Sequence, residues 1–233
     1  MTEFRPSSFQ ILPAVIKNLL ILNGLFFLAQ NTVGKELINM DDLFALHTWQ
    51  SPLFHPWQFI THMFMHGDLG HIFGNMFALW MFGSILENLW GPKRFLTFYL
   101  VCGLGAALCH MIVLYQEMKP VVDAYNLMPY EQQQALLHNP NFKLNEATLG
   151  ASGAVFGCLT AFGYLFPNTR IYIYFFIPLK AKWFVLLYAG FELSMAINNS
   201  AGDNVAHVAH LGGALVGFLL VYFWNKKNRK TFY

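Results

Sequence analysis

The chain has 233 residues, of which 56% are hydrophobic and only 11% are charged. Soluble domains carry roughly 25% charged residues, so this composition excludes an ordinary globular protein and indicates a membrane protein. The formal net charge of +2 gives no sign of a nucleic-acid-binding surface, because the basic residues lie at the ends of apolar segments. The cysteines all lie within apolar segments, where we expect free packing thiols rather than disulfides: Cys102, Cys109 and Cys158.

Six segments are apolar over nearly the length that a transmembrane helix needs, which is roughly 20 residues. We therefore predict an all-α membrane protein, a compact bundle of six transmembrane helices formed by a single domain over residues 1–233. The first segment lacks the cleavage site of a signal peptide and is expected to remain as a span. In chain order, the predicted spans cover residues 13–30, 69–89, 95–115, 148–166, 183–197 and 205–224. A further apolar run over residues 171–179 contains Pro178 and is predicted to lie at the membrane interface.

The basic residues are distributed unevenly across the predicted membrane. With six spans, both termini lie on one side, and 11 of the 14 basic residues fall on that side. The positive-inside rule then predicts that both termini are cytoplasmic, and we expect a multi-pass protein of a bacterial inner membrane. The basic residues behind this prediction are Arg5, Lys17, Lys93, Arg94, Arg170, Lys180, Lys182, Lys226, Lys227, Arg229 and Lys230.

Two polar residues stand out within the predicted spans. Ser152 lies near the outer end of the fourth span and His210 near the outer end of the sixth. An ionisable group at membrane depth is costly, so an intramembrane histidine indicates a functional site. A serine hydroxyl is a weak nucleophile that needs a base within hydrogen-bond reach, and His210 is such a base. The pair predicts hydrolysis inside a membrane, with activity that falls as the imidazole is protonated, near pH 6.5 for an unperturbed histidine.

The start of the second span supplies further polar groups at the same level. His71 and Asn75 are four residues apart, so they share one face of a helix, and Asp68 is placed to cap that helix. A tetrahedral intermediate needs fixed hydrogen-bond donors for its oxyanion. We expect those donors to be the Asn75 amide, a His71 N–H and the backbone N–H of Ser152.

Glycines recur on the fourth and sixth spans. Small residues allow two membrane helices to approach closely, and without a close approach Ser152 and His210 would not touch. The glycines expected to support this packing are Gly150, Gly153, Gly157, Gly213 and Gly217.

These residues resemble the motifs of the rhomboid intramembrane serine proteases. The GxSG motif is present as the GASG run around Ser152, the AHxxGxxxG motif begins at Ala209 and includes His210, and the HxxxN pair begins at His71. The resemblance covers nearly the whole chain. One departure lies in the first outer loop, where the family often has Trp-Arg and this chain has Trp57 followed by Gln58.

The resemblance implies a mechanism and a substrate class. Ser152 would be the nucleophile and His210 the general base of a Ser–His dyad that lacks an acid. His71 and Asn75 would help to line the oxyanion hole. The substrates would be transmembrane segments of membrane proteins, cut near small residues within the lipid bilayer. No cofactor and no metal ion are expected.

Two other functions stay open at this stage. One is a catalytically inactive rhomboid-like protein that binds and escorts membrane proteins. The other is a metal transporter or metalloprotease, although no HExxH motif is present. That rival would use the chain's clustered histidines, which are His62, His66, His71, His207 and His210.

Some polar features have no predicted role in catalysis. We expect His62 and His66 to pack within a loop, and His207 to be structural or to line the rim of the site. Glu192 is a carboxylate inside the fifth span with no obvious partner. The connection over residues 116–147 contains polar residues and prolines, and nothing in it indicates chemistry.

Overall fold

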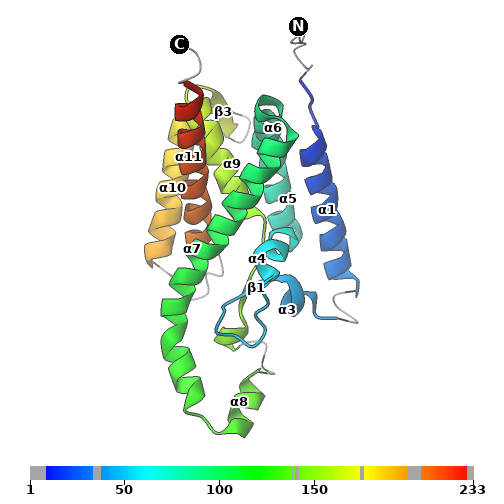
Figure 1. Ribbon diagram of the computed structural model, residues 1–233, viewed down its shortest axis with the longest axis vertical. Helices are drawn as coiled ribbons and strands as arrows, with labels where there is room; N and C mark the ends of the chain where they lie inside the picture. Colours follow the sequence, from blue (N-terminus) through cyan, green and yellow to red (C-terminus); the bar gives the residue numbers. More distant parts are fainter. Residues whose placement is uncertain are drawn as a thin grey trace.

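The computed structural model describes residues 9–33, 38–137, 139, 142–173, 176–198 and 206–229. The helices form a bundle in which the first helix begins and the last helix ends at the same end (Figure 1). The bundle consists of α1 (Ala14–Asn31), α5 (Leu69–Ala78), the π-helical turn η2 (Leu79–Gly83), α6 (Ser84–Trp90), α7 (Pro92–Asn126), α9 (Ser152–Leu165), α10 (Ala181–Asn198) and α11 (His207–Arg229). The connecting elements are α3 (Met40–Phe44), β1 (Leu46–His47), α4 (Gln58–Thr61), η1 (His62–Phe64), α8 (Tyr130–Leu137), η3 (Lys143–Asn145), β2 (Ala147–Thr148), β3 (Arg170–Ile173) and β4 (Ile177–Lys180).

The prediction of an all-α membrane protein is confirmed. Within the described residues, four helices are long and apolar enough to cross a membrane: Ala14–Asn31, Leu69–Trp90, Pro92–Asn126 and His207–Lys226. The other two predicted spans are α9 and α10. The apolar helix α9 has 14 residues, so it is about 21 Å long and shorter than the hydrocarbon core of a typical bilayer.

The third span is much longer than predicted. Helix α7 has 35 residues, which corresponds to about 52 Å, and its last part projects beyond the bundle toward α8 (Figure 1). We expected this helix to end at residue 115 because polar residues and Pro120 follow. Proline removes one helical hydrogen bond, yet the helix continues to Asn126. Part of the predicted 116–147 connection is therefore helical.

Two short sheets correct the predicted boundaries. Across the run 171–179, which was predicted to lie at the membrane interface, β3 and β4 pair as an antiparallel hairpin with Arg170 opposite Lys180, and the interfacial location stays a prediction. The fourth span starts at Ser152 rather than at Thr148, because β2 pairs with β1 and places Thr148 opposite Leu46. The short β1–β2 pairing therefore fixes the approach of the chain to Ser152.

The core lies where α7 packs against α9 and α11. Phe95, Phe98 and Tyr99 on α7 are fully buried there, and the Phe98 ring contacts those of Trp90 and Trp224. At the opposite edge, α1 is joined to α6 by a buried charge, since the Glu87 carboxylate accepts hydrogen bonds from the first backbone N–H groups of α1. Such groups have no partner within their own helix, so Glu87 has a structural role.

Candidate active site

Ser152 is the first residue of α9, and the loop before it is tightly constrained. Gly150 has a φ of 126°, a conformation that residues with a Cβ rarely adopt. A Cβ at this position would also lie 2.7 Å from Nε2 of His71. The Gly150 N–H donates a hydrogen bond to the backbone carbonyl of His62 at 2.9 Å. The loop therefore holds Ser152 at the N-terminus of α9, where backbone N–H groups point outward.

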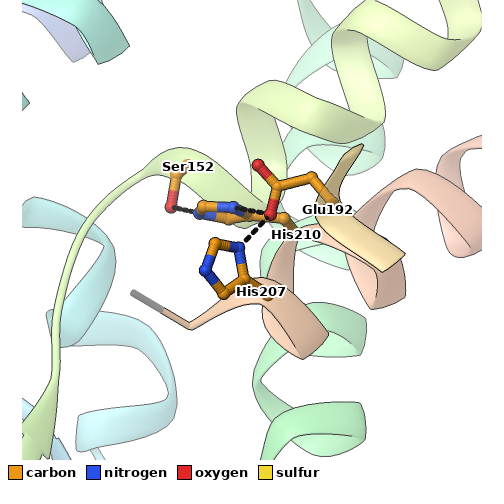
Figure 2. Close-up of polar contacts among 4 residues, drawn as sticks. All are labelled: Ser152, Glu192, His207 and His210. Carbon is orange, nitrogen blue, oxygen red and sulfur yellow. Dashed lines mark hydrogen bonds and ion pairs between the residues drawn. The ribbon is translucent and has the colours of Figure 1, made fainter. Parts of the chain in front are cut away.

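His210 lies on the first turns of α11 and reaches Ser152. Its Nε2 is 2.8 Å from Oγ of Ser152 (Figure 2). The expected contact between residues on two different membrane helices is present, within the distance of a normal hydrogen bond. The ring of Phe156, one turn after Ser152 on α9, stacks on the His210 imidazole with centroids 4.5 Å apart and an interplanar angle of 5°. The imidazole is thus held both at its edge and on its face.

A glycine seam brings α9 and α11 together. A Cβ on Gly213 would collide with the backbone carbonyl of Gly153, and a Cβ on Gly217 would lie 2.7 Å from Cα of Gly157. On the other side, a Cβ on Gly157 would lie 2.6 Å from Sγ of Cys102 on α7. These four glycines therefore permit an approach that no side chain would allow, as expected for close packing of membrane helices.

Gly150 differs from these four glycines. It precedes α9 rather than lying on it, so the expectation that it supports helix packing is wrong. The position that a side chain of Gly150 would occupy is bordered by two candidate catalytic residues. A Cβ there would lie near His71 Nε2 and 3.6 Å from Ser152 Oγ. The absence of a side chain at Gly150 keeps this space open.

His71 and Asn75 lie on α5, which packs beside α9. The predicted cap is present, since the Asp68 side chain accepts a hydrogen bond from the His71 N–H at 2.8 Å. His71 Nε2 and Ser152 Oγ lie 2.7 Å and 3.6 Å from the point that a Cβ on Gly150 would occupy, so both residues border the space beside Gly150. Asn75 is buried, with 7% of its surface exposed. His71 therefore borders the same space as the serine, while the described hydrogen bonds of the Ser152 side chain include neither His71 nor Asn75.

Glu192 is a residue of the site that the sequence motifs did not predict. The Glu192 carboxylate on α10 is 2% exposed, and its Oε2 lies 2.9 Å from Nδ1 of His210 and 2.7 Å from Nδ1 of His207 (Figure 2). A signal was available, because a carboxylate inside a membrane span indicates a functional site by default. Its partner could not be identified, because the sequence does not show which face of α10 turns toward α11.

The same three side chains form a set that could bind a metal ion. One ligand atom from each of Glu192, His207 and His210 lies within 4.8 Å of the others. Two histidines and one carboxylate are a common ligand set for catalytic zinc. In this arrangement, however, both Nδ1 atoms already share one carboxylate oxygen, so the hydrogen-bonded pairing accounts for all three side chains.

The loop histidines pack as predicted. The His62 Nδ1 lies 2.8 Å from the Gln58 carbonyl oxygen, and burial lowers the pKa of His62 from 6.5 to about 4. Burial, together with the nearby His71, likewise lowers the pKa of His66 to about 4. Both imidazoles are therefore neutral at pH 7 and contribute packing rather than charge.

The departure from the family's Trp-Arg pair is accommodated within the first outer loop. The Gln58 side chain is fully buried and donates hydrogen bonds to the backbone carbonyls of Asp42 at 3.0 Å and Leu53 at 2.8 Å. The Trp57 ring N–H donates to the carbonyl of Leu43 at 2.9 Å. Gln58 therefore ties this loop together by hydrogen bonds that need no charge.

Comparison with known proteins assigns the chain to a family. The sequence matches the Rhomboid domain over residues 54–227, which is more than half of the chain. The chain belongs to the rhomboid family. The matched region contains Ser152, His210, His71, Asn75 and Glu192, so the residues gathered at the site all lie within the rhomboid domain.

Curated relatives include other rhomboid proteins. This rhomboid is 29% identical to RHOMBOID-like protein 12, mitochondrial, of Arabidopsis thaliana over 203 residues, which cover 87% of this chain and 56% of that protein. It is 28% identical to Rhomboid protein 1, mitochondrial, of Saccharomyces cerevisiae over 176 residues, covering 73% of this chain and 42% of the other. It is 25% identical to Rhomboid protease GluP of Bacillus subtilis over 162 residues, which cover 70% of this chain and 25% of that protein. The chain thus spans between about a quarter and a little over half of the length of these relatives.

The relatives bear on the membrane in which the protein resides. The part of the chain that the structure describes has four helices able to span a bilayer, so this rhomboid is a multi-pass membrane protein. The expectation of a bacterial inner membrane is not supported, because the first three matches are named as mitochondrial proteins.

Proposed function

We propose that this rhomboid is an intramembrane serine protease that hydrolyses peptide bonds in transmembrane segments of membrane proteins. The observation that carries the proposal is the 2.8 Å contact between Ser152 Oγ and His210 Nε2. A hydroxyl this close to an imidazole nitrogen can transfer its proton as it attacks a carbonyl carbon. The family membership supports the same reaction, since one matched relative is named as a rhomboid protease.

The proposed reaction begins at Ser152. Its Oγ attacks the scissile carbonyl carbon while His210 Nε2 accepts the hydroxyl proton. The resulting oxyanion is stabilised by the Ser152 backbone N–H at the start of α9, with His71 and Asn75 as further donors. His210 then returns the proton to the leaving amine, which leaves an acyl group on Ser152. Water, activated by the same imidazole, releases the second product.

The depth of the site sets the class of substrate. Ser152 and His210 occupy the first turns of α9 and α11, and α11 ends at the end of the bundle where α1 begins (Figure 1). The positive-inside rule puts the end with the termini on the cytoplasmic or equivalent face, although Arg5 and Lys230 lie outside the described residues. A peptide bond reaching this level belongs to the outer part of a membrane span, and small residues there let the substrate helix unwind.

The direct test is cleavage of a membrane reporter. The purified protein, reconstituted in lipid vesicles, is incubated with a reporter that carries one transmembrane segment, and the new N-terminus of the product is sequenced. The proposal expects one cut inside the segment with the natural protein and none with Ser152→Ala. A cut that persists in Ser152→Ala would refute the assignment of the nucleophile.

A protein that binds and escorts membrane proteins without cutting them is the alternative. The two functions differ in whether the serine is reactive. A fluorophosphonate probe should label the folded natural protein and leave Ser152→Ala unlabelled. Absence of labelling in a folded sample that still binds the reporter would favour the escort function.

A metal-dependent hydrolase is a second candidate because of the ligand set formed by Glu192, His207 and His210. The serine mechanism expects activity to be indifferent to a chelator. Activity that is lost with a chelator and restored by zinc would support the metal mechanism instead.

A further inference from the structure

Glu192 is the charged side chain that α10 buries. Its Oε2 receives two hydrogen bonds from α11, one from His210 and one from His207, at 2.9 Å and 2.7 Å (Figure 2). Ionised carboxylates are expensive to bury unless they are paired or hydrogen-bonded. The two N–H donors on one oxygen provide that compensation, so this carboxylate is built into the site.

We propose that Glu192 is a positioning residue that extends the Ser152–His210 dyad to a Ser–His–Glu triad. This inference rests on the proposed protease function. Glu192 does not touch the reacting atoms, and it acts only through the imidazole of His210. It fixes which nitrogen of that imidazole carries the proton and in which direction the ring points.

The hydrogen-bonding capacity of each group determines the tautomer of His210. An ionised carboxylate only accepts hydrogen bonds, so the His210 Nδ1 must carry the proton that it shares with Glu192. A neutral imidazole has a single N–H, and therefore Nε2 is left with its lone pair. That lone pair faces the Ser152 hydroxyl at 2.8 Å. The carboxylate thus selects the tautomer in which His210 can act as a base toward the serine.

The same contact acts again once the proton has moved. When Ser152 attacks, His210 becomes a positively charged imidazolium with the Glu192 carboxylate 2.9 Å from its Nδ1. Opposite charges at this separation attract strongly where water is scarce. The pair therefore stabilises the charge that develops in the transition state, which is the general function of the third group in serine hydrolases.

His207 restrains Glu192 from a second direction. His207 and His210 are three residues apart on α11, and the two rings are nearly perpendicular at 88° with centroids 6.3 Å apart. Because His207 donates to the same oxygen, rotation of the carboxylate away from His210 would break two hydrogen bonds at once. Phe156 stacks on the His210 ring, so the imidazole is held by three groups, which are Ser152, Glu192 and Phe156.

Two substitutions of Glu192 separate its effects. Glu192→Leu removes the acceptor and the charge, and we expect kcat for a transmembrane reporter to fall by about 10²–10⁴ with KM nearly unchanged. Glu192→Gln retains an oxygen that accepts from both histidines and removes only the charge, so we expect a smaller loss, of about tenfold. A matched control is Glu87→Gln, since Glu87 is also buried but bonds the backbone of α1.

The pH dependence of the cleavage rate distinguishes the two roles of Glu192, because loss of a merely structural residue would not shift this profile. In Glu192→Gln, the carboxylate no longer stabilises the imidazolium, so the acidic limb of the rate profile should shift to lower pH. Glu87→Gln should leave this limb in place. The described chain places further titratable groups around the pair, and these are unchanged in both variants: His71, His110, Tyr188 and His207.

The outcomes distinguish this inference from the proposed function. If the natural protein cuts the reporter and Ser152→Ala does not, the protease function stands. If Glu192→Leu then retains activity within about threefold, and the acidic limb of the pH–rate profile does not move in Glu192→Gln, the triad is overturned. If Glu192→Leu fails to fold, the test rests on folded Glu192→Gln. A shift of its acidic limb to lower pH supports the triad, and an unshifted limb overturns it. A natural protein that neither cuts the reporter nor reacts with a fluorophosphonate refutes the protease function itself.

Discussion

Helices α9 and α10 are neighbours that differ in how much of their surface is buried and in which side chains they bury. Helix α9 buries ten of its 14 residues, all of them small or apolar. Helix α10 buries two of its 18 residues, Ala181 and the charged Glu192, and exposes large apolar side chains such as Leu187 and Ile197. In a bilayer, exposed apolar side chains face lipid at little cost, and the interior is left for groups that need a partner.

The difference assigns separate tasks to the two helices. Helix α9 carries Ser152 on a seam so closely packed that its position relative to α11 is fixed. Helix α10 contributes a single polar contact to His210 from the side, through Glu192. Changes in α9 and α11 should therefore affect both folding and chemistry, whereas most changes in α10 should affect neither. The following predictions test that contrast.

The largest effect is expected at Ser152 and His210, the proposed nucleophile and its base. Ser152→Ala and His210→Ala should each lower kcat for a transmembrane reporter by about 10⁴ or more, because the nucleophile and its base act as one unit. The double variant should be scarcely worse than either single variant. Rates that multiply independently in the double variant would show that the two residues do not act together. The measurement is single-turnover cleavage in lipid vesicles.

A smaller effect is expected at Asn75 on α5, a proposed oxyanion donor. Asn75→Ala should lower kcat by about 10²–10³, the usual cost of one lost donor, with little change in KM. Gly74→Ala on the same helix is the control, since a Cβ there meets nothing within 4 Å. An Asn75→Ala variant as active as the control would remove Asn75 from the oxyanion hole.

The glycine seam predicts a contrast in stability. Gly213→Ala should destabilise the protein by about 1–3 kcal/mol, because its methyl group would collide with the Gly153 carbonyl and the helices would have to separate. Gly190→Ala on α10 should be neutral or slightly stabilising, because a Cβ there meets nothing within 4 Å. Thermal unfolding in detergent measures both variants. Equal unfolding temperatures would show that the seam is not tightly packed.

The loop that supports the site predicts sensitivity to acid. Because the pKa of His62 is lowered to about 4, its contribution to stability is complete above the unfolded value of 6.5 and is lost as the pH falls toward 4. The loss at pH 4 is about 3 kcal/mol at most. His62→Gln keeps a donor for the Gln58 carbonyl but does not titrate. Its unfolding temperature should therefore fall less between pH 7 and pH 4 than that of the natural protein, and an equal fall would contradict this assignment.

The sequence predicts the elements that depend on local composition and motif. The spans follow from apolar length, and the contact between Ser152 and His210 follows from motifs at matching depth on two helices. The end of α7 was not predicted, because Pro120 and polar residues normally favour a break. The β3–β4 hairpin was not predicted either, because a short apolar run does not show whether it folds as a strand pair or as a helix.

The role of Glu192 shows what the sequence does not contain. Its pairing with His210 depends on the rotation of α10 about its own axis. Apolar residues surround that helix on all sides, so its hydrophobic pattern does not mark an inward face. The position of Gly150 was misjudged for a similar reason, since the short pairing of β1 with β2 decides where α9 begins.

Mass spectrometry of a covalent adduct tests most directly whether His210 activates the Ser152 hydroxyl. The folded protein is treated with a fluorophosphonate, digested, and the modified residue is identified. We predict one adduct, on Ser152, that forms in the natural protein and is absent from His210→Ala. An adduct on another residue, or equal modification of Ser152 without His210, would contradict the account.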